Sequence, residues 1–250
     1  MKILENFFSP VGQYGILIWR AFSKPEKPKI FFKRFINEID ILGVQSLGIV
    51  TIISLFMGAV VCIQTASNID SAFIPAYTVG FTVRQTVLLE FSPTILALIL
   101  AGKVGSNIAS ELGSMRVSEQ IEALEIMGIN SASYLILPKI SAAMFIFPFV
   151  VLISMFLSMI GGYIAATLTG AVSSADFIYG LTYDFRPFSV TYGLIKTIVF
   201  AFIITSIPAY FGYYARGGSL EVGASSTKAV VNSSITILIF NYILTQLLLI

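Results

Sequence analysis

The sequence predicts an all-α integral membrane protein, with an N-terminal interfacial amphipathic helix followed by five transmembrane helices. Hydrophobic residues make up 56% of the 250 positions, charged residues make up only 11%, and the mean hydropathy is +0.90. A soluble domain usually has about a quarter of its residues charged. This chain therefore has more apolar surface than a single water-soluble core can bury, and lipid is its expected solvent.

The second observation is a series of apolar runs of the right length. A helix needs about 20 apolar residues to cross roughly 30 Å of hydrocarbon. The second run contains Glu90, the fourth contains Lys196, and Pro148 lies inside the third, where a tilt or kink is expected. The five runs are residues 41–66, 85–106, 140–175, 190–215 and 229–250.

Lysine and arginine are distributed unequally between the two sides of these spans. With five spans, the N-terminus and the second and fourth connections share one side, and the other side has only Arg84 and Arg186. Cytoplasmic segments are enriched in Lys and Arg, so we expect a cytoplasmic N-terminus and a C-terminus outside. The residues on the cytoplasmic side are Lys2, Arg20, Lys24, Lys27, Lys29, Lys33, Arg34, Lys103, Arg116, Lys139, Arg216 and Lys228.

Residues 1–40 are expected to form helices at the membrane surface, before a five-span domain over residues 41–250. The segment FFKRFINEIDIL, from residue 31, would form a helix in the cytoplasmic interface, and residues 3–20 show a weaker form of the same pattern. The alternative is an ordinary solvated segment before the first span. The apolar face would consist of Phe31, Phe32, Phe35, Ile36 and Ile39.

Several function classes are excluded by composition. The formal net charge of +2 and the lack of a basic recognition motif argue against a nucleic-acid partner. The sequence has no histidine, the commonest metal ligand and general base. Cys62 is the only cysteine, so an intrachain disulfide and a thiolate metal cluster are excluded. We expect no metal and no catalytic residue on this chain.

An acidic stretch lies between the second and third apolar runs. Residues 111–128, ELGSMRVSEQIEALEIMG, carry five charges, and as a helix they would present a small apolar ridge of Ile121, Leu124 and Met127. Such a helix suits docking into a groove on another protein, whereas the alternative is a plain loop with a solvated charged face. The sequence contains no G-x-x-x-x-G-K-[ST] motif, the phosphate-binding loop of many ATPases.

Two long blocks resemble the MlaE-type ABC permease family. Residues 101–130, AGKVGSNIASELGSMRVSEQIEALEIMGIN, are similar to its signature, which runs close to AGR-x-G-x-x-x-AAE-(L/I)-G-x-MR-x-(S/T)-EQ-(I/L)-x-(A/S)-x-x-x-MG. Residues 193–249 contain the GLIK, VF, RGG, VG and T-(K/R)-AVV elements of the last two spans, in order. The resemblance extends more loosely from about residue 30 to the C-terminus.

The resemblance implies a non-catalytic permease subunit of an ABC transporter that moves phospholipids between inner and outer membranes. It implies a homodimer in the bacterial inner membrane, a cytoplasmic ATPase that binds ATP and Mg, and a periplasmic MCE-type substrate-binding protein. It also implies that residues at about 107–133 couple the chain to the ATPase. The expected coupling residues are Glu111, Gly113, Arg116, Glu119, Gln120, Glu122 and Leu124.

Lipid binding is expected at two sets of residues in the spans. Glu90 and Lys196 are candidates because a charge inside the membrane costs about 2.5–3.5 kcal/mol on insertion scales. They could pair with each other or contact a headgroup, and the alternative is that both anchor helices at the interface. A greasy groove for lipid tails, or else ordinary packing with lipid or other helices, is expected on the first span at Phe56, Met57, Val60 and Val61.

The resemblance is incomplete around Glu90. The family's second span opens with a block like R-E-L-G-P, where this chain has Leu89, Glu90, Phe91, Ser92 and Pro93. Headgroup contacts of the family's arginine therefore have no counterpart at Leu89. Lys196 matches the lysine of the GLIK element. A further difference is Asn241, at a position where many relatives carry an acid.

Two other functions are open from the residues alone. An ion-gradient-driven secondary transporter or channel usually has ionisable residues near the midplane of broken helices, and these spans have few. An intramembrane enzyme acting on lipids would need acids, His or a Ser/Lys pair gathered at one depth. Only Glu90 and Lys196 come close to that arrangement. The sequence favours the permease subunit.

Overall fold

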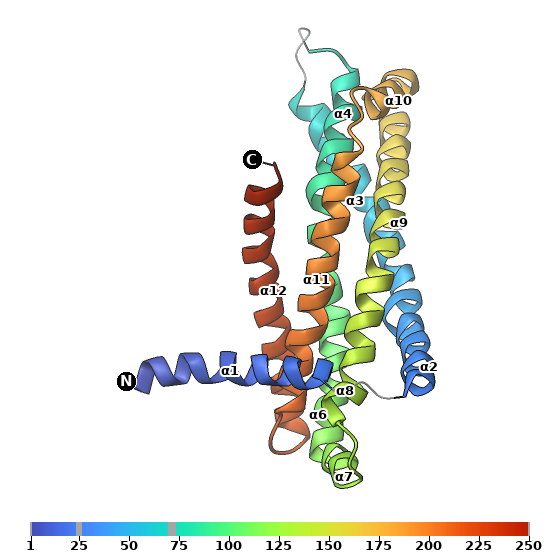
Figure 1. Cartoon of the computed structure of the whole chain (residues 1–250). Coiled ribbons are helices and arrows are strands. Elements are labelled where there is room, and N and C mark those ends of the chain that lie inside the picture. Colours follow the sequence, from blue (N-terminus) through green and yellow to red (C-terminus); the bar gives the residue numbers. More distant parts are fainter. Residues whose placement is uncertain (1, 24–26, 70–73, 250) are drawn as a thin grey trace.

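The computed structural model describes residues 2–23, 27–69 and 74–249, and within them the chain is helical and has no strand. Five of its helices are long and apolar enough to cross a membrane, and they run side by side as a bundle (Figure 1). The all-α class and the number of spans are therefore confirmed. The five helical stretches are Pro28–Asn68, Tyr77–Val117, Ser131–Thr169, Phe188–Tyr213 and Ser219–Leu249.

The first two spans are composite helices. The first consists of α2 (Pro28–Glu38), η1 (Ile39–Gly43), η2 (Val44–Ser46) and α3 (Leu47–Asn68). The second consists of α4 (Tyr77–Thr86), η3 (Val87–Ile95), α5 (Leu96–Leu100), η4 (Ala101–Gly105) and α6 (Ser106–Val117). The segments η1, η3 and η4 are π-helical. This geometry is rare in proteins, and where it occurs it is often at a functional site. Glu90 lies in η3 and Lys103 lies in η4.

The remaining helices are α1 (Lys2–Ser23), α7 (Gln120–Ile126), α8 (Ser131–Leu135), α9 (Leu137–Thr169), α10 (Ser174–Thr182), α11 (Phe188–Tyr213) and α12 (Ser219–Leu249). The third span is shorter at its far end than the predicted run 140–175, because Gly170 adopts a left-handed φ of 65° and ends α9. The helix continues unbroken through Pro148. The first, second and fifth spans extend well beyond the apolar runs that predicted them.

The helix that lies across the bundle is the N-terminal helix α1. The N-terminal helix α1 lies transverse to the spans (Figure 1) and packs on α8 and α11. Leu17 and Ala21 are fully buried against the bundle, while Trp19 is 77% exposed on the opposite side. The helix predicted from residue 31 is continuous with the first span, because η1 and η2 continue the helical backbone from α2 into α3 without a break.

Glycines allow α3 and α9 to cross in close contact. A Cβ built at Gly58 would lie 1.8 Å from the carbonyl oxygen of Ser158, and one at Gly161 would lie 2.0 Å from that of Leu55. Small residues at such crossings permit the backbone approach on which helix association in membranes depends. In the same interface, Ser54 donates a hydrogen bond to Ser154 at 2.8 Å between the oxygens.

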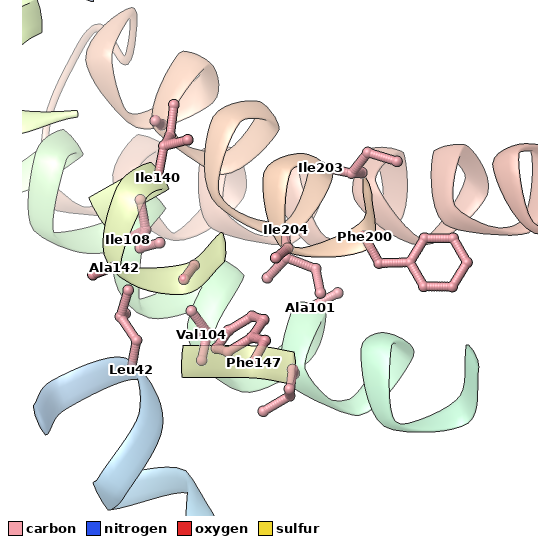
Figure 2. Packing of buried hydrophobic residues seen from close by; sticks show 14 of the residues in the cluster. Leu42, Ala101, Val104, Ile108, Ile140, Ala142, Phe147, Phe200, Ile203 and Ile204 are labelled. Carbon is pink, nitrogen blue, oxygen red and sulfur yellow. The ribbon is translucent and has the colours of Figure 1, made fainter. Parts of the chain in front are cut away.

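The apolar core joins all the spans near the end of the bundle that carries α7. Figure 2 shows Leu42 from the first span close to Ile108 of α6 and Ala142 of α9, with Phe147 and Ile204 further along. All five side chains are at most 1% exposed. We call this end of the molecule the α7 end.

At the opposite end, Arg84 holds α10 against α4. Arg84 is 2% exposed, and its guanidinium donates hydrogen bonds to the carbonyls of Leu181 (2.8 Å), Tyr183 (2.9 Å) and Asp184 (3.3 Å). The last carbonyls of a helix lack intrahelical donors. Arg84 therefore satisfies the C-terminal carbonyls of α10 and ties the loop after it to the second span.

We predict that Gly58→Ala lowers stability by about 1–3 kcal/mol, the usual cost of overpacking, because the added methyl group would collide with a backbone carbonyl of α9. Gly48→Ala is the matched control on the same helix, since a Cβ there meets nothing within 4 Å. The measurement is thermal unfolding of the two purified variants in detergent. If both variants unfold like the parent chain, the α3–α9 crossing does not depend on Gly58.

Candidate functional site

Two groups of charged residues form ion pairs between the spans, at different levels of the bundle. We call the first group the membrane cluster, which consists of Glu90, Thr94, Lys196 and Asn241. The second group surrounds Lys139 at the α7 end. The hydroxyl of Ser154, fifteen residues after Lys139 on α9, donates a hydrogen bond to Ser92 at 3.3 Å, which fixes the relative height of the two groups. At 1.5 Å per residue they are about 22 Å apart along the bundle.

The membrane cluster is built around an ion pair. Lys196 Nζ lies 2.8 Å from Glu90 Oε1 and also donates to the Leu89 carbonyl at 3.2 Å. Asn241 donates its amide to Glu90 Oε2 at 3.1 Å, and the hydroxyl of Thr94 lies 3.1 Å from the same oxygen. The Lys196 side chain is fully buried, whereas that of Glu90 is 43% exposed. The pairing of Glu90 with Lys196, one of the possibilities expected from the sequence, is present.

Gly193 brings α11 close enough for this pair to form. A Cβ at Gly193 would meet the Leu88 carbonyl oxygen at 3.0 Å and the Met155 methyl carbon at 2.6 Å. Lys196 follows three residues later and therefore lies on the same face of α11. The cluster thus depends on a glycine contact between α11 and η3, and the GLIK element contains both residues.

The four apolar candidates on the first span lie away from the membrane cluster. They are on α3, which packs mainly on α9, whereas the cluster is formed by η3, α11 and α12. Phe56 and Val60 are 70% and 54% exposed, Met57 is half-buried, and Val61 is 6% exposed in a small core beside α4 and α10. The structure therefore does not bring these residues together with Glu90 and Lys196.

At the α7 end, Lys139 links three spans through two carboxylates. Its Nζ lies 2.7 Å from Glu38 Oε1 on α2 and 2.8 Å from Glu111 Oε2 on α6. The lysine side chain is only 3% exposed, and that of Glu38 is 11% exposed. Glu111, a predicted coupling residue, is therefore also part of the packing of α6 against α2 and α9.

The helix α7 folds back on α6 through a strained residue. Glu119 has a left-handed φ of 58°, which is uncommon outside glycine. The turn directs Ile121, which is fully buried, and Leu124 toward the bundle, so most of the expected docking ridge is used internally. The large exposed apolar residues of the segment 111–128 are Val117 (39%), Ile126 (87%) and Met127 (65%).

The other predicted coupling residues occupy different environments. Arg116 pairs with Glu122 at 2.9 Å. Gly113 is buried in the packing of α6 against α12, where a Cβ would lie 3.0 Å from the Val222 side chain. Glu119 and Gln120 are exposed. Of this set, Glu119 and Gln120 are the most accessible to a partner.

Glu125, which was not among the predicted site residues, accepts hydrogen bonds from several helices. Its Oε1 accepts hydrogen bonds from Arg20 (2.9 Å), Ser131 (2.9 Å) and Tyr213 (3.0 Å). Asn130 in turn donates to the Arg20 carbonyl at 2.8 Å. These contacts join α1, α7, α8 and α11 at one carboxylate. The spacing in the sequence could have indicated this role, because Glu125 lies four residues after Ile121 and therefore on the same, buried face of α7.

Glu125 is held in its ionised form. Partial burial acts to raise the pKa of its carboxyl group, but hydrogen bonds from Ser131, Tyr213 and Arg20, with the charge of Arg20, outweigh it and lower the pKa below the ordinary 4.5. A lowered folded-state pKa gives stability that is present above the unfolded value and lost as the pH falls through the folded value. The attachment of α1 should therefore weaken only below about pH 4.5.

The single tryptophan, Trp19, is adjacent to Arg20 on α1 and reports this attachment. We predict that lowering the pH from 7 to below 4.5 changes Trp19 fluorescence anisotropy, because protonated Glu125 loses its ion pair with Arg20. Glu125→Gln should show the low-pH signal already at pH 7 and no transition. A transition that persists in Glu125→Gln would have to come from another group.

The fold and the buried ion pairs define a multi-pass helical membrane protein. A sequence model of the family described as Permease MlaE matches residues 35–247. The chain belongs to this family and is an ABC transporter permease of the MlaE type, as the resemblance of residues 101–130 and 193–249 implied.

Several named proteins are similar to this chain over most of its length. A probable ABC transporter permease protein of Rickettsia bellii is 35% identical over 95% of this chain and 91% of its own length. The intermembrane phospholipid transport system permease protein MlaE of Haemophilus influenzae is 27% identical over 99% of this chain and 95% of its own. The chloroplastic protein TRIGALACTOSYLDIACYLGLYCEROL 1 of Arabidopsis thaliana is 29% identical over 92% of this chain and 68% of its own.

We predict that the two halves of the Glu90–Lys196 pair are unequal. Glu90→Gln leaves a fully buried ammonium without its carboxylate and should cost about 3–5 kcal/mol. Lys196→Met should cost less, because Glu90 is partly exposed and keeps its contacts with Asn241 and Thr94. The double variant should recover part of the loss. Unfolding of the three variants in detergent gives the ranking, and equal losses for both single variants would contradict it.

Proposed function

We propose that this chain is the membrane-spanning subunit of an ABC transporter that moves phospholipids between the inner and outer membranes. Membership of the MlaE permease family carries the proposal. One relative is named as part of an intermembrane phospholipid transport system. The chain itself is proposed to be non-catalytic, because its sequence has no phosphate-binding loop. ATP and Mg would be bound by a separate ATPase subunit.

The ATPase is proposed to dock at the α7 end, on residues of the segment 107–133. The exposed side chains Glu119, Gln120, Ile126 and Met127 give this surface both charge and apolar area. The surface is continuous with the spans, because α6 belongs to the same unbroken helical stretch as Glu90. A displacement of α6 by the ATPase would therefore be transmitted into the membrane.

The other partners are proposed to be a second copy of this chain and a periplasmic MCE-type protein. The homodimer is supported by α12, a span with many exposed apolar side chains. The Lys/Arg asymmetry supports an inner-membrane location with the N-terminus and α7 in the cytoplasm, and the C-terminus in the periplasm. The exposed residues of α12 include Val231, Ile235, Leu238, Ile239 and Tyr242.

The lipid is proposed to pass the membrane cluster. Glu90 is partly exposed and in a π turn, so a headgroup can approach it, while the buried Lys196 holds it in place. Asn241 leaves the cluster with one acid and one base, so its formal charge is zero. The exposed apolar residues Phe56 and Val60 could contact lipid tails on a different face of the bundle.

The experiment is ATP-dependent transfer of a fluorescent phospholipid by the reconstituted complex of permease and ATPase. We predict that Glu111→Gln or Arg116→Gln lowers transfer per ATP hydrolysed several-fold, because each loosens α6 from its neighbours, while the chain still inserts in the membrane. Lys196→Ala should reduce transfer without dissociating the ATPase. Glu221→Gln, an exposed acid at the start of α12, is the control.

Two outcomes would contradict the proposed function. One is full transfer by both the Glu111 and Arg116 variants, which would remove the coupling role of α6. The other is lipid or ion flux by the purified chain alone under an ion gradient, which would support the secondary transporter instead.

A further inference from the structure

Lys103 is a charged residue in the middle of the second helical stretch, not at its end. It lies in η4, fourteen residues before the end of α6, and its side chain is exposed. Its Nζ donates a hydrogen bond to the backbone carbonyl of Gln45 in η2. Gln45 is four residues into the uncharged run that begins at Ile41, which is about 6 Å along the helix axis.

The buried cations of the spans are neutralised or saturated by protein groups, whereas the exposed Lys103 has no carboxylate partner. Lys196 and Lys139 have carboxylate partners, and Arg84 binds three carbonyls. Among the residues that the structure describes, no carboxylate lies within ion-pair distance of Lys103. An ammonium has three donors, and only one is used here. A charge at this depth requires a counter-ion or water.

A groove between the first two spans opens beside this ammonium. Its volume is about 440 Å³, and among the residues that the structure describes Lys103 is the only ionisable one in its lining. The polar part of the lining consists of Gln45, Ser106, Asn107 and Ser110. Gln45 donates its amide to Asp40 Oδ2 at 3.3 Å, and Ser106 donates its hydroxyl to the Lys103 carbonyl at 3.1 Å. Among the lining residues that the structure describes, Asn107 and Ser110 are therefore the neutral donors that remain for an anion. The remaining wall, which contains Ile41, Leu42 and Val104, is apolar.

The local helix geometry places Lys103 at this groove. Val104 is 3% exposed and lies in the core, and Gly105 packs on α11, where a Cβ would lie 3.1 Å from Pro208. With these two residues facing the bundle, the preceding lysine is directed away from it. The alternative to a charged ligand is solvation by water alone, but that leaves the apolar wall of the groove without a partner.

We propose that this groove binds the phosphate of a membrane phospholipid in the leaflet at the α7 end. One positive charge, neutral donors from α6 and an apolar wall match a phosphodiester anion attached to a glycerol and acyl chains. Lys103 lies thirteen residues from Glu90, about 20 Å along the second span, so the site is distinct from the membrane cluster. Binding at this groove goes beyond the proposed function, because it requires a phospholipid bilayer around the chain but neither an ATPase nor transport.

The test is photocrosslinking in nanodiscs of phosphatidylethanolamine and phosphatidylglycerol that contain a trace of diazirine-bearing phosphatidylglycerol. We expect the full-length chain to be labelled at residues 41–45 and 103–110. Lys103→Gln should reduce this labelling at least tenfold, and Lys103→Arg should retain it. Lys228→Gln, at an exposed lysine of α12, is the matched control and should be labelled like the parent chain.

A diazirine-bearing diacylglycerol with the same tails separates phosphate recognition from tail contact, and it should label the groove no more than it labels Lys103→Gln. If Lys103→Gln does not fold, Asn107→Leu provides the second variant, with a several-fold loss expected. Equal labelling by the phospholipid and the diacylglycerol would overturn the proposal. So would a carbodiimide crosslink between Lys103 and a carboxylate of a second copy, because the counter-charge would then be protein.

Discussion

A cation inside a membrane-spanning bundle is stable only where protein groups replace the water that it has lost. Lys196 has a carboxylate and a carbonyl, and the ring of Tyr192 lies 4.6 Å from its ammonium. Lys139 has two carboxylates, and Arg84 has three carbonyls. In each case the carboxylates and carbonyls come from a different segment of the chain than the helix that carries the cation. Satisfying these charges therefore fixes how the spans are arranged.

Close helix approach is what allows such partners to reach one another. Gly193 permits α11 to touch η3 at Leu88, and the Glu90–Lys196 pair forms one turn away. Gly58 does the same for α3 and α9, beside the hydrogen bond from Ser54 to Ser154. The glycines bind nothing themselves. Their lack of a side chain determines the distances over which the polar groups act.

The spans and their number could be predicted from the sequence because charged residues are rare inside a membrane, so that long uncharged runs mark the spans. Glu90 and Lys196 could be placed at a similar depth in the membrane, because each lies a few residues from the same end of its apolar run. The helix ends were less predictable, since hydropathy marks where lipid ends and not where the backbone stops being helical. Residues 107–117, which include the charged Glu111 and Arg116, continue the second helix for this reason.

The contacts at the α7 end had weaker signals. Glu119 adopts a left-handed conformation without being glycine, so nothing in the local sequence indicated that α7 folds back and buries Ile121. Glu38 and Lys139 are separated by 101 positions, and they meet only because α2 and α9 are neighbours in the bundle. Such pairs depend on topology, which a single sequence does not contain.

The second span combines continuity with two places of altered backbone geometry. It is one helical stretch of 41 residues, so α6 cannot move without acting on the residues above it. Its π turns, where the α-helical hydrogen bonds are shifted, lie at η3 and η4. Helices bend most readily at such turns, and these two contain Glu90 and Lys103. A movement of α6 would therefore be absorbed where the two charged side chains are, and would change their orientation before it changed the packing of α4 with α10.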